Sequence, residues 1–131
     1  MSPRAEDLRA IPLLSGLDVV ALEKLAAGTS ELEAYAGQPL THPGATGTGM
    51  FFVVEGMVEV DAPEGHRELG PGEFFGEMGV LEKAKRNATV VAKTPMTLLT
   101  LNAWDVKRLE KKSPEAMRQL EEVIEQRRQS S

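Results

Sequence analysis

The sequence contains no cysteine and only two histidines among its 131 residues. Disulfide bonds and thiolate metal sites are therefore excluded, and a reducing compartment, the cytoplasm, is the expected location. No apolar run approaches the roughly 20 residues that a helix needs to cross a bilayer, so we expect no membrane insertion by this chain.

Positive charge is also scarce, because 15 Lys and Arg residues face 20 Asp and Glu residues and leave a formal net charge of −5. Proteins that grip DNA or RNA by its phosphates usually carry a basic excess, so no direct nucleic acid binding is expected. Hydrophobic residues make up 41% of the chain, as in an ordinary globular protein. A chain of this length predicts one domain over residues 1–131.

The N-terminal region, about residues 10–28, is predicted to be helical. Asp18 can cap a helix that Gly28 ends. Between them apolar residues recur at helical spacing: Val19, Leu22, Leu25 and Ala26. The preceding segment, residues 11–17, reads as a short apolar turn that packs beneath the next layer.

From about residue 31 to 101 the pattern changes to short apolar or alternating segments separated by glycine and proline. The clearest segments are 31–35, 50–54, 57–60, 66–69, 88–92 and 96–101. With the stretches between them they indicate about eight strands, which is the rhythm of a sandwich or jelly roll.

Helical spacing returns over about residues 102–128, where two helices are predicted. Asn102 can cap the first, and Ser113 followed by Pro114 can begin the second. We expect Trp104 to pack the first of these helices onto the strands. The second carries an apolar stripe of Met117, Leu120, Val123 and Ile124. The predicted fold is α+β: an N-terminal helix region, an eight-stranded antiparallel β-roll and two C-terminal helices.

The most informative stretch is residues 70–90, which combines a glycine-rich turn with Glu77 and Arg86. Glycines let backbone N–H groups approach an anion, and an arginine offers a fork of donors that suits phosphate oxygens. A carboxylate beside such a site is suited to accept a hydroxyl proton. One ligand uses all three groups: a ribose that carries a phosphate. Taken alone, the same residues also fit a surface salt bridge on a tight turn.

In its setting of strands this stretch resembles a known family, the cyclic nucleotide-binding domains of bacterial catabolite activator proteins, protein kinase A regulatory subunits and cyclic-nucleotide-gated channels. The similarity lies in Phe75-Gly-Glu-Met-Gly-Val80, a short loop over residues 81–85, and Arg86-Asn-Ala-Thr-Val90. It extends over about residues 10–125. The resemblance implies the β-roll of this family, also called a double-stranded β-helix or jelly roll.

The resemblance also implies roles for individual residues. Arg86 would bind the cyclic phosphate, assisted by the backbone N–H groups of Asn87 and Ala88. Glu77 would accept the ribose 2′-hydroxyl proton, assisted by the backbone of Gly76. The pocket around the base would be formed by Met78, Gly79 and Val80, with Met117, Leu120 or Ile124 closing over it. The same apolar stripe also fits ordinary core or a dimer seam, and both interpretations stay open.

The ligand implied is cAMP, the family's commonest, with cGMP as the alternative. Family members that prefer guanine often carry Thr after the arginine, whereas this chain has Asn87, so base selectivity is left open. No metal or other cofactor is expected.

A non-enzymatic regulatory module is therefore the leading hypothesis, with nucleotide binding coupled allosterically to movement of the C-terminal helices. Its output would pass through an effector domain or partner protein, or through a homodimer made by the last helix. Two other classes compete with it. A metal-dependent cupin enzyme would need a cluster of histidines, which the two histidines here supply poorly. A scaffold that keeps the fold without binding nucleotide is the other.

Overall fold

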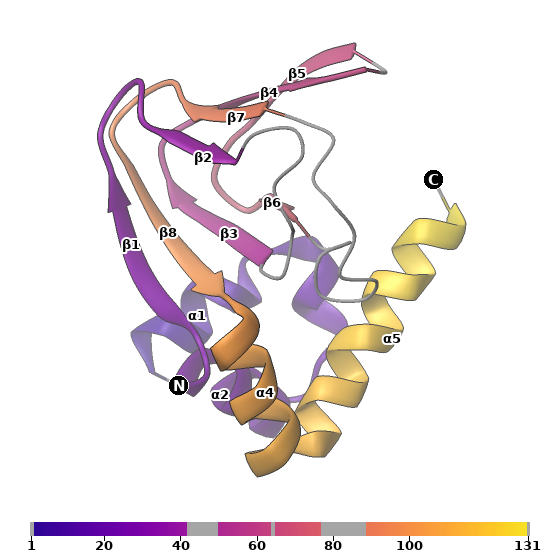
Figure 1. The fold of residues 1–131 in the computed structure, drawn as a ribbon. Coiled ribbons are helices and arrows are strands. Elements are labelled where there is room, and N and C mark those ends of the chain that lie inside the picture. Colours follow the sequence, from indigo (N-terminus) through magenta and orange to yellow (C-terminus); the bar gives the residue numbers. More distant parts are fainter. Residues whose placement is uncertain (1, 42–49, 64, 77–88, 131) are drawn as a thin grey trace.

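The structure is a computed structural model that describes residues 2–41, 50–63, 65–76 and 89–130 (Figure 1). Within these residues, strands form two four-stranded antiparallel sheets, and helices cover the outer face of one of them. This arrangement confirms the predicted α+β β-roll with helices at both ends.

The N-terminal helical region begins at Pro3, earlier than the predicted start at about residue 10. They are α1 (Pro3–Arg9), the 3₁₀ helix η1 (Pro12–Gly16), α2 (Val19–Ala27), α4 (Ala103–Lys112) and α5 (Pro114–Ser130). The hydroxyl of Ser2 caps α1 by accepting from the Ala5 N–H at 3.2 Å. The apolar turn expected at residues 11–17 is η1.

Helix α2 starts where its capping residue predicts. The carboxylate of Asp18 accepts from the Ala21 N–H at 2.7 Å, and Gly28 ends the helix. Its buried residues are Ala21, Leu22, Leu25 and Ala26, whereas Val19 is 56% exposed. Val19 shares the helical spacing of these residues but is the first residue of α2, so it lies at the end of the buried face and stays exposed.

The strands are β1 (Ser30–Ala34), β2 (Pro39–Thr41), β3 (Met50–Glu55), β4 (Val58–Ala62), β5 (Gly65–Leu69), β6 (Phe74–Phe75), β7 (Thr89–Ala92) and β8 (Met96–Leu101). Their order is β1-β8-β3-β6 in the first sheet and β2-β7-β4-β5 in the second. Strand β1 runs antiparallel to β8, with Leu32 opposite Leu98. Sequence neighbours therefore pair rarely, and each sheet joins segments from both ends of the chain.

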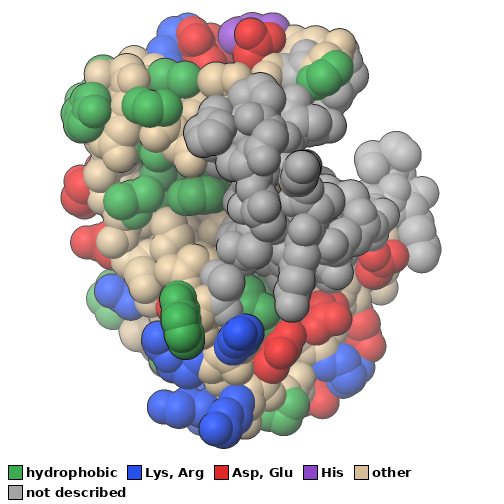
Figure 2. All heavy atoms as spheres, in the orientation of Figure 1, with side chains coloured by type: hydrophobic (Ala, Val, Ile, Leu, Met, Phe, Trp, Pro, Cys, Tyr) green, Lys and Arg blue, Asp and Glu red, His purple; other side chains and the backbone are tan. Residues whose placement is uncertain are grey.

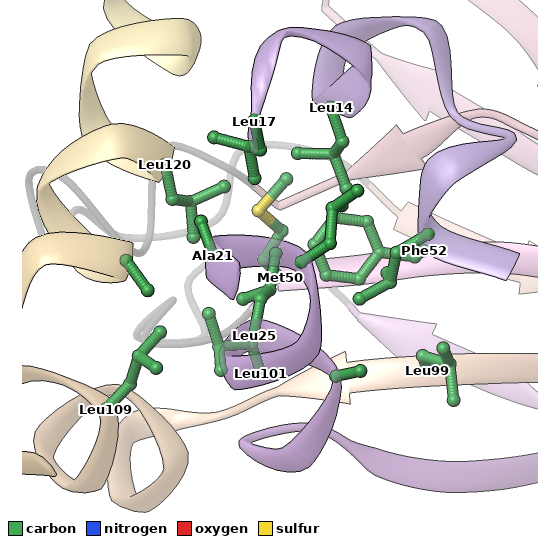
Figure 3. Close-up of a cluster of buried hydrophobic side chains, with 14 of the residues drawn as sticks. Leu14, Leu17, Ala21, Leu25, Met50, Phe52, Leu99, Leu101, Leu109 and Leu120 are labelled. Atoms are coloured by element: carbon green, nitrogen blue, oxygen red, sulfur yellow. The ribbon is translucent and has the colours of Figure 1, made fainter. Parts of the chain in front are cut away.

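Two apolar clusters hold the fold together, one on each face of the first sheet. Along β3, Met50 and Phe52 face the helices, while Val53 and Phe51 face the second sheet. This alternation follows from the two-residue period of a strand. Figure 3 shows the helical cluster, in which Leu14, Leu25 and Leu120 converge on the side chains of β3 and β8.

The turn between β3 and β4 carries the chain from the first sheet to the second. Gly56 lies there with φ +94°, and a Cβ at this position would come within 2.5 Å of the carbonyl oxygen of Pro95. The Met57 N–H donates to the Thr94 hydroxyl at 3.0 Å. The turns β3–β4 and β7–β8 therefore pack directly on each other.

Helix α4 begins with a capping box in which Asn102 and Asp105 each accept from the other's backbone N–H. Asp105 as a residue is only 2% exposed, and Val106 and Leu109 face the core. Trp104 is 76% exposed, so the prediction that it packs the helix onto the strands was wrong. It lies two residues before Val106, about 200° round the helix, and so faces away from the core.

Helix α5 lies along the helical layer against η1, α2 and α4 (Figure 1). The amide of its Gln119 donates to the carboxylate of Asp18 at 3.2 Å. Within the described part of the chain, none of the helices is long and apolar enough to cross a membrane.

Candidate functional site

The stretch with Glu77 and Arg86 connects the two sheets. It leaves the first sheet at the end of β6, the edge strand, and enters the second sheet at β7, between β2 and β4. Seven of the predicted site residues lie outside the described residues: Glu77, Met78, Gly79, Val80, Arg86, Asn87 and Ala88. The structure therefore fixes the two ends of the candidate site, at Gly76 and Thr89.

Gly76 is the predicted site residue at the first of these ends. Its φ is +85°, in the left-handed region that favours glycine, and it follows β6 directly. Gly76 is partly buried. A side chain here would strain the backbone just where the chain turns out of the first sheet.

Two stacked phenylalanines adjoin Gly76. Phe75 is paired in register with Phe51 of β3, and their ring centroids are 4.8 Å apart with an angle of 11° between the planes. Phe75 is buried and Phe51 partly exposed. The pair forms an apolar surface beside the start of the candidate site.

Three partly buried apolar side chains, Leu32, Leu40 and Phe51, pack against the cluster inside the roll. They come from β1, β2 and β3, and so from both sheets. No sequence motif singled out any of these three residues. For Phe51 the sequence offered a partial signal, since it lies in the apolar run of residues 50–54 and alternate side chains of a strand face opposite sides.

A tight turn positions β6. The Gly70 N–H donates to the Glu73 carboxylate at 2.7 Å, and the Gly72 N–H donates to the Val53 carbonyl at 3.0 Å. A Cβ on Gly70 would come within 2.7 Å of the Met57 sulfur, so a larger residue would require the Met57 side chain to move. The hydrogen bond from Gly72 therefore ties this turn to β3 just before Phe74 and Phe75 pair with the same strand.

Charged groups whose pKa values shift lie on the outer surface. The Glu68 carboxylate accepts from Lys93, and this hydrogen bond lowers the pKa of Glu68 and raises the pKa of Lys93. Among the described residues there is no group of three or more His, Cys, Asp or Glu that could hold a metal ion. His66 is exposed on β5, and His42 lies outside the described residues.

The three C-terminal residues predicted to close over a base belong to the helical cluster. Met117, Leu120 and Ile124 are at most 3% exposed and pack with side chains of η1 and α2. In Figure 3 Leu120 points toward Leu17 and Ala21. In this arrangement they form core, and closing over a ligand in the roll would require α5 to move.

The sequence matches one protein family over residues 31–113, from β1 to the end of α4: the cyclic nucleotide-binding domain. This match covers both sheets and the whole connection between β6 and β7. The chain belongs to the cyclic nucleotide-binding domain family.

Two solved structures and one relative illustrate the membership. A cyclic nucleotide-gated potassium channel of Rhizobium etli is 38% identical over 119 residues, which are 91% of this chain and 34% of the channel. The N-terminal domain of a transcriptional regulator from Streptomyces coelicolor is 31% identical, with a TM-score of 0.78 over 94% of this chain and 92% of that domain. A structure described as "A cyclic-GMP-dependent signalling pathway regulates bacterial phytopathogenesis" is 33% identical, with a TM-score of 0.75 over 88% and 96%.

This cyclic nucleotide-binding domain spans about a third of the length of the channels that it resembles, between 29% and 34%. The Streptomyces and cyclic-GMP-pathway structures, by contrast, are covered almost completely. The described chain therefore corresponds to one regulatory domain, which in the channels is part of a longer protein.

Proposed function

We propose that this domain binds a cyclic nucleotide inside its β-roll and prefers cAMP. One observation carries the proposal: the ordered set Gly76, Glu77 and Arg86 lies in the connection between β6 and β7, inside the region that matches the family. The names of the relatives support the ligand class, since one is a cyclic nucleotide-gated channel and another belongs to a cyclic-GMP-dependent pathway.

Arg86 binds the cyclic phosphate in this proposal. The phosphate carries a single negative charge, and the guanidinium can meet two of its oxygens with parallel hydrogen bonds. The backbone N–H groups of Asn87 and Ala88 add donors where β7 is about to begin. Because phosphate and guanidinium are partly desolvated together, losing Arg86 is expected to cost about 2–4 kcal/mol of binding free energy.

Glu77 and Gly76 bind the ribose. The carboxylate of Glu77 accepts the 2′-hydroxyl proton, and the left-handed backbone of Gly76 lets the chain approach the sugar closely. Met78, Gly79 and Val80 line the pocket beside them. The stacked pair Phe51 and Phe75, which adjoins Gly76, supports an apolar wall at this end of the pocket.

The preference for cAMP over cGMP depends on Asn87. Members of the family that favour guanine often carry Thr at this position, which here is Asn. The relative from a cyclic-GMP-dependent pathway supports cGMP as the alternative ligand.

In this proposal, ligand binding is coupled to a movement of α5. The helix is joined to α4 at Ser113, and its buried stripe rests on α2 and η1. If a nucleotide binds more tightly to one position of α5 than to another, it shifts the population between them. Amide hydrogen exchange of residues 114–126 with and without cAMP tests this coupling, with 5′-AMP as the control ligand. Unchanged exchange at saturating cAMP would contradict it.

The output passes to an effector domain or partner protein, as the position of this domain within longer channels suggests. A homodimer through the C-terminal helix would use the exposed side of α5, because the apolar stripe is buried within the chain. The cysteine-free sequence suits action in the cytoplasm.

Calorimetric titration with cAMP, cGMP and 2′-deoxy-cAMP tests the proposed function. We expect cAMP to bind more tightly than cGMP, and the deoxy ligand to bind at least roughly tenfold more weakly, because the Glu77 carboxylate then loses its hydroxyl partner. Absence of heat with any of the three at millimolar concentration would favour a scaffold that does not bind nucleotide.

A further inference from the structure

The outward side of α4 carries the chain's single tryptophan and a row of cations. Trp104, Lys107, Arg108, Lys111 and Lys112 are all exposed, while Val106 and Leu109 are buried on the opposite side. At about 100° of rotation per residue, these five side chains fall on one continuous side of the helix. We call this surface the α4 basic face.

The cations of the α4 basic face are largely free of partners within the described residues. Lys107, Lys111 and Lys112 make no ion pair there, and Arg108 lies 3.6 Å from the buried carboxylate of Asp105. The Lys107 ammonium instead lies 5.8 Å from the centre of the Trp104 ring. Figure 2 shows blue side chains gathered at the lower end of the molecule, over the region of α4 in Figure 1.

From this face we propose that α4 docks the domain onto an anionic lipid bilayer surface. The indole of Trp104 is an apolar body with one N–H donor, and such side chains settle at the headgroup level of a bilayer. Lysine and arginine stems can lie along the interface while their charges meet lipid phosphates. The chain as a whole is acidic, so this local concentration of positive charge also orients the approach.

Two other binding partners fit the α4 basic face less well than a bilayer does. A second copy of the chain placed on α4 would bring the same cations together, and like charges repel. An acidic polypeptide would satisfy the lysines, but it would also need a pocket shaped for Trp104, which projects from a convex helix. A bilayer accepts the indole and the cations without such a pocket. The acidic polypeptide becomes an outcome of the test.

Vesicle binding monitored by Trp104 fluorescence tests the proposal, because Trp104 is the sole tryptophan of the chain. With vesicles of phosphatidylcholine containing about 30% phosphatidylserine, we expect emission to shift to shorter wavelength and the protein to sediment with the vesicles. With pure phosphatidylcholine we expect neither, and about 0.5 M salt should reverse the binding.

A matched pair of variants assigns the effect to this face. The double substitution K107Q/K111Q should lower the vesicle partition coefficient at least roughly tenfold, since each cation near an anionic surface contributes favourably. The control R9Q/R67Q removes the same charge from exposed positions on α1 and β5 and should leave the partition coefficient nearly unchanged. Trp104→Phe should weaken sedimentation while the circular dichroism spectrum stays that of the folded protein.

Three results would overturn the proposal: no vesicle binding at low salt, equal loss in both double variants, or a shift with poly-L-glutamate but not with vesicles. The last would identify an acidic polypeptide as the partner. Nucleotide binding is measured separately by calorimetry, so failure of the docking proposal leaves the proposed nucleotide function standing, and the reverse also holds.

Discussion

The side-chain amide of Gln119 donates a hydrogen bond to the carboxylate of Asp18 at 3.2 Å, and these two residues, 101 positions apart in sequence, join α5 to the start of α2. The same carboxylate caps α2 by accepting from the Ala21 N–H at 2.7 Å. One side chain therefore both begins an N-terminal helix and holds the C-terminal helix against it. If α5 moves on ligand binding, this contact is among those that must break.

Substitutions at this contact should separate its two roles. Gln119→Ala removes only the bond between the helices and should lower the melting temperature slightly, because this hydrogen bond is exposed to solvent. Asp18→Ala also removes the cap of α2 and should lower it more, by several degrees. The double variant should melt close to Asp18→Ala alone, as measured by circular dichroism. Additive losses in the double variant would show that the two residues are not coupled.

Stability should also depend on the ionisation of Asp18. The hydrogen bond from the Ala21 N–H, followed by that from Gln119, holds the pKa of this carboxyl below its ordinary value of 3.8. The unfolded chain therefore takes up the proton more readily. The stabilisation that the ionised Asp18 provides is complete above its pKa in the unfolded chain. It is lost as the pH falls through the lower pKa that Asp18 has in the folded protein. The stability of wild type relative to Asp18→Asn should accordingly decline on acidification below about pH 4, as urea titrations at several pH values can measure.

The helical core should depend strongly on Leu120, whose side chain is fully buried between α5, η1 and α2. Leu120→Ala should lower the free energy of unfolding by about 2–5 kcal/mol, because it leaves a cavity where side chains from several elements meet. Val20→Ala at a 67% exposed position is the matched control and should change it by less than about 0.5 kcal/mol. A loss in Leu120→Ala as small as in the control would mean that α5 is not part of the core in solution.

Two glycines with similar φ angles, Gly37 and Gly56, should lose different amounts of stability when each is replaced by alanine. Gly37 has φ +91° and open space around its Cβ position, so Gly37→Ala should cost about 1–2 kcal/mol of backbone strain. At Gly56 the new methyl would also meet the Pro95 carbonyl oxygen at 2.5 Å. Gly56→Ala should therefore lower the free energy of unfolding, measured by urea denaturation, by about 1–3 kcal/mol more than Gly37→Ala does. Equal losses would show that the β3–β4 turn can move away from the β7–β8 turn at little cost.

The sequence predicted best those elements whose ends are fixed by local chemistry. Asp18 at the start of α2, Asn102 with Asp105 at the start of α4, and Pro114 at the start of α5 are all found where their capping or turn preferences place them. The strands with clear apolar patterns, such as β3 and β8, were also found. Local patterns sufficed because a capping residue marks the start of a helix, and a short apolar run marks a buried strand whichever strand pairs with it.

The sequence could not predict features that depend on pairing with a distant strand, or on which side of a helix faces the core. Strand β2 begins at Pro39, which reads as a break, and it exists because β7 pairs with it. The exposure of Trp104 follows from the capping box, which turns Asp105 inward and so rotates Trp104 outward. At the candidate site, the motif indicated Gly76, Glu77 and Arg86 directly, whereas the stacking of Phe51 on Phe75 depends on the pairing of β3 with β6.

Calorimetric titration of Arg86→Ala with cAMP tests the central claim most directly. Arg67→Ala is the matched control, because it removes an exposed arginine from β5 and changes the net charge equally. We expect wild type and Arg67→Ala to bind cAMP alike, and Arg86→Ala to lose at least roughly tenfold in affinity, since the phosphate then lacks its cation. If Arg86→Ala binds cAMP as tightly as wild type, Arg86 does not hold the phosphate and the proposed site is wrong.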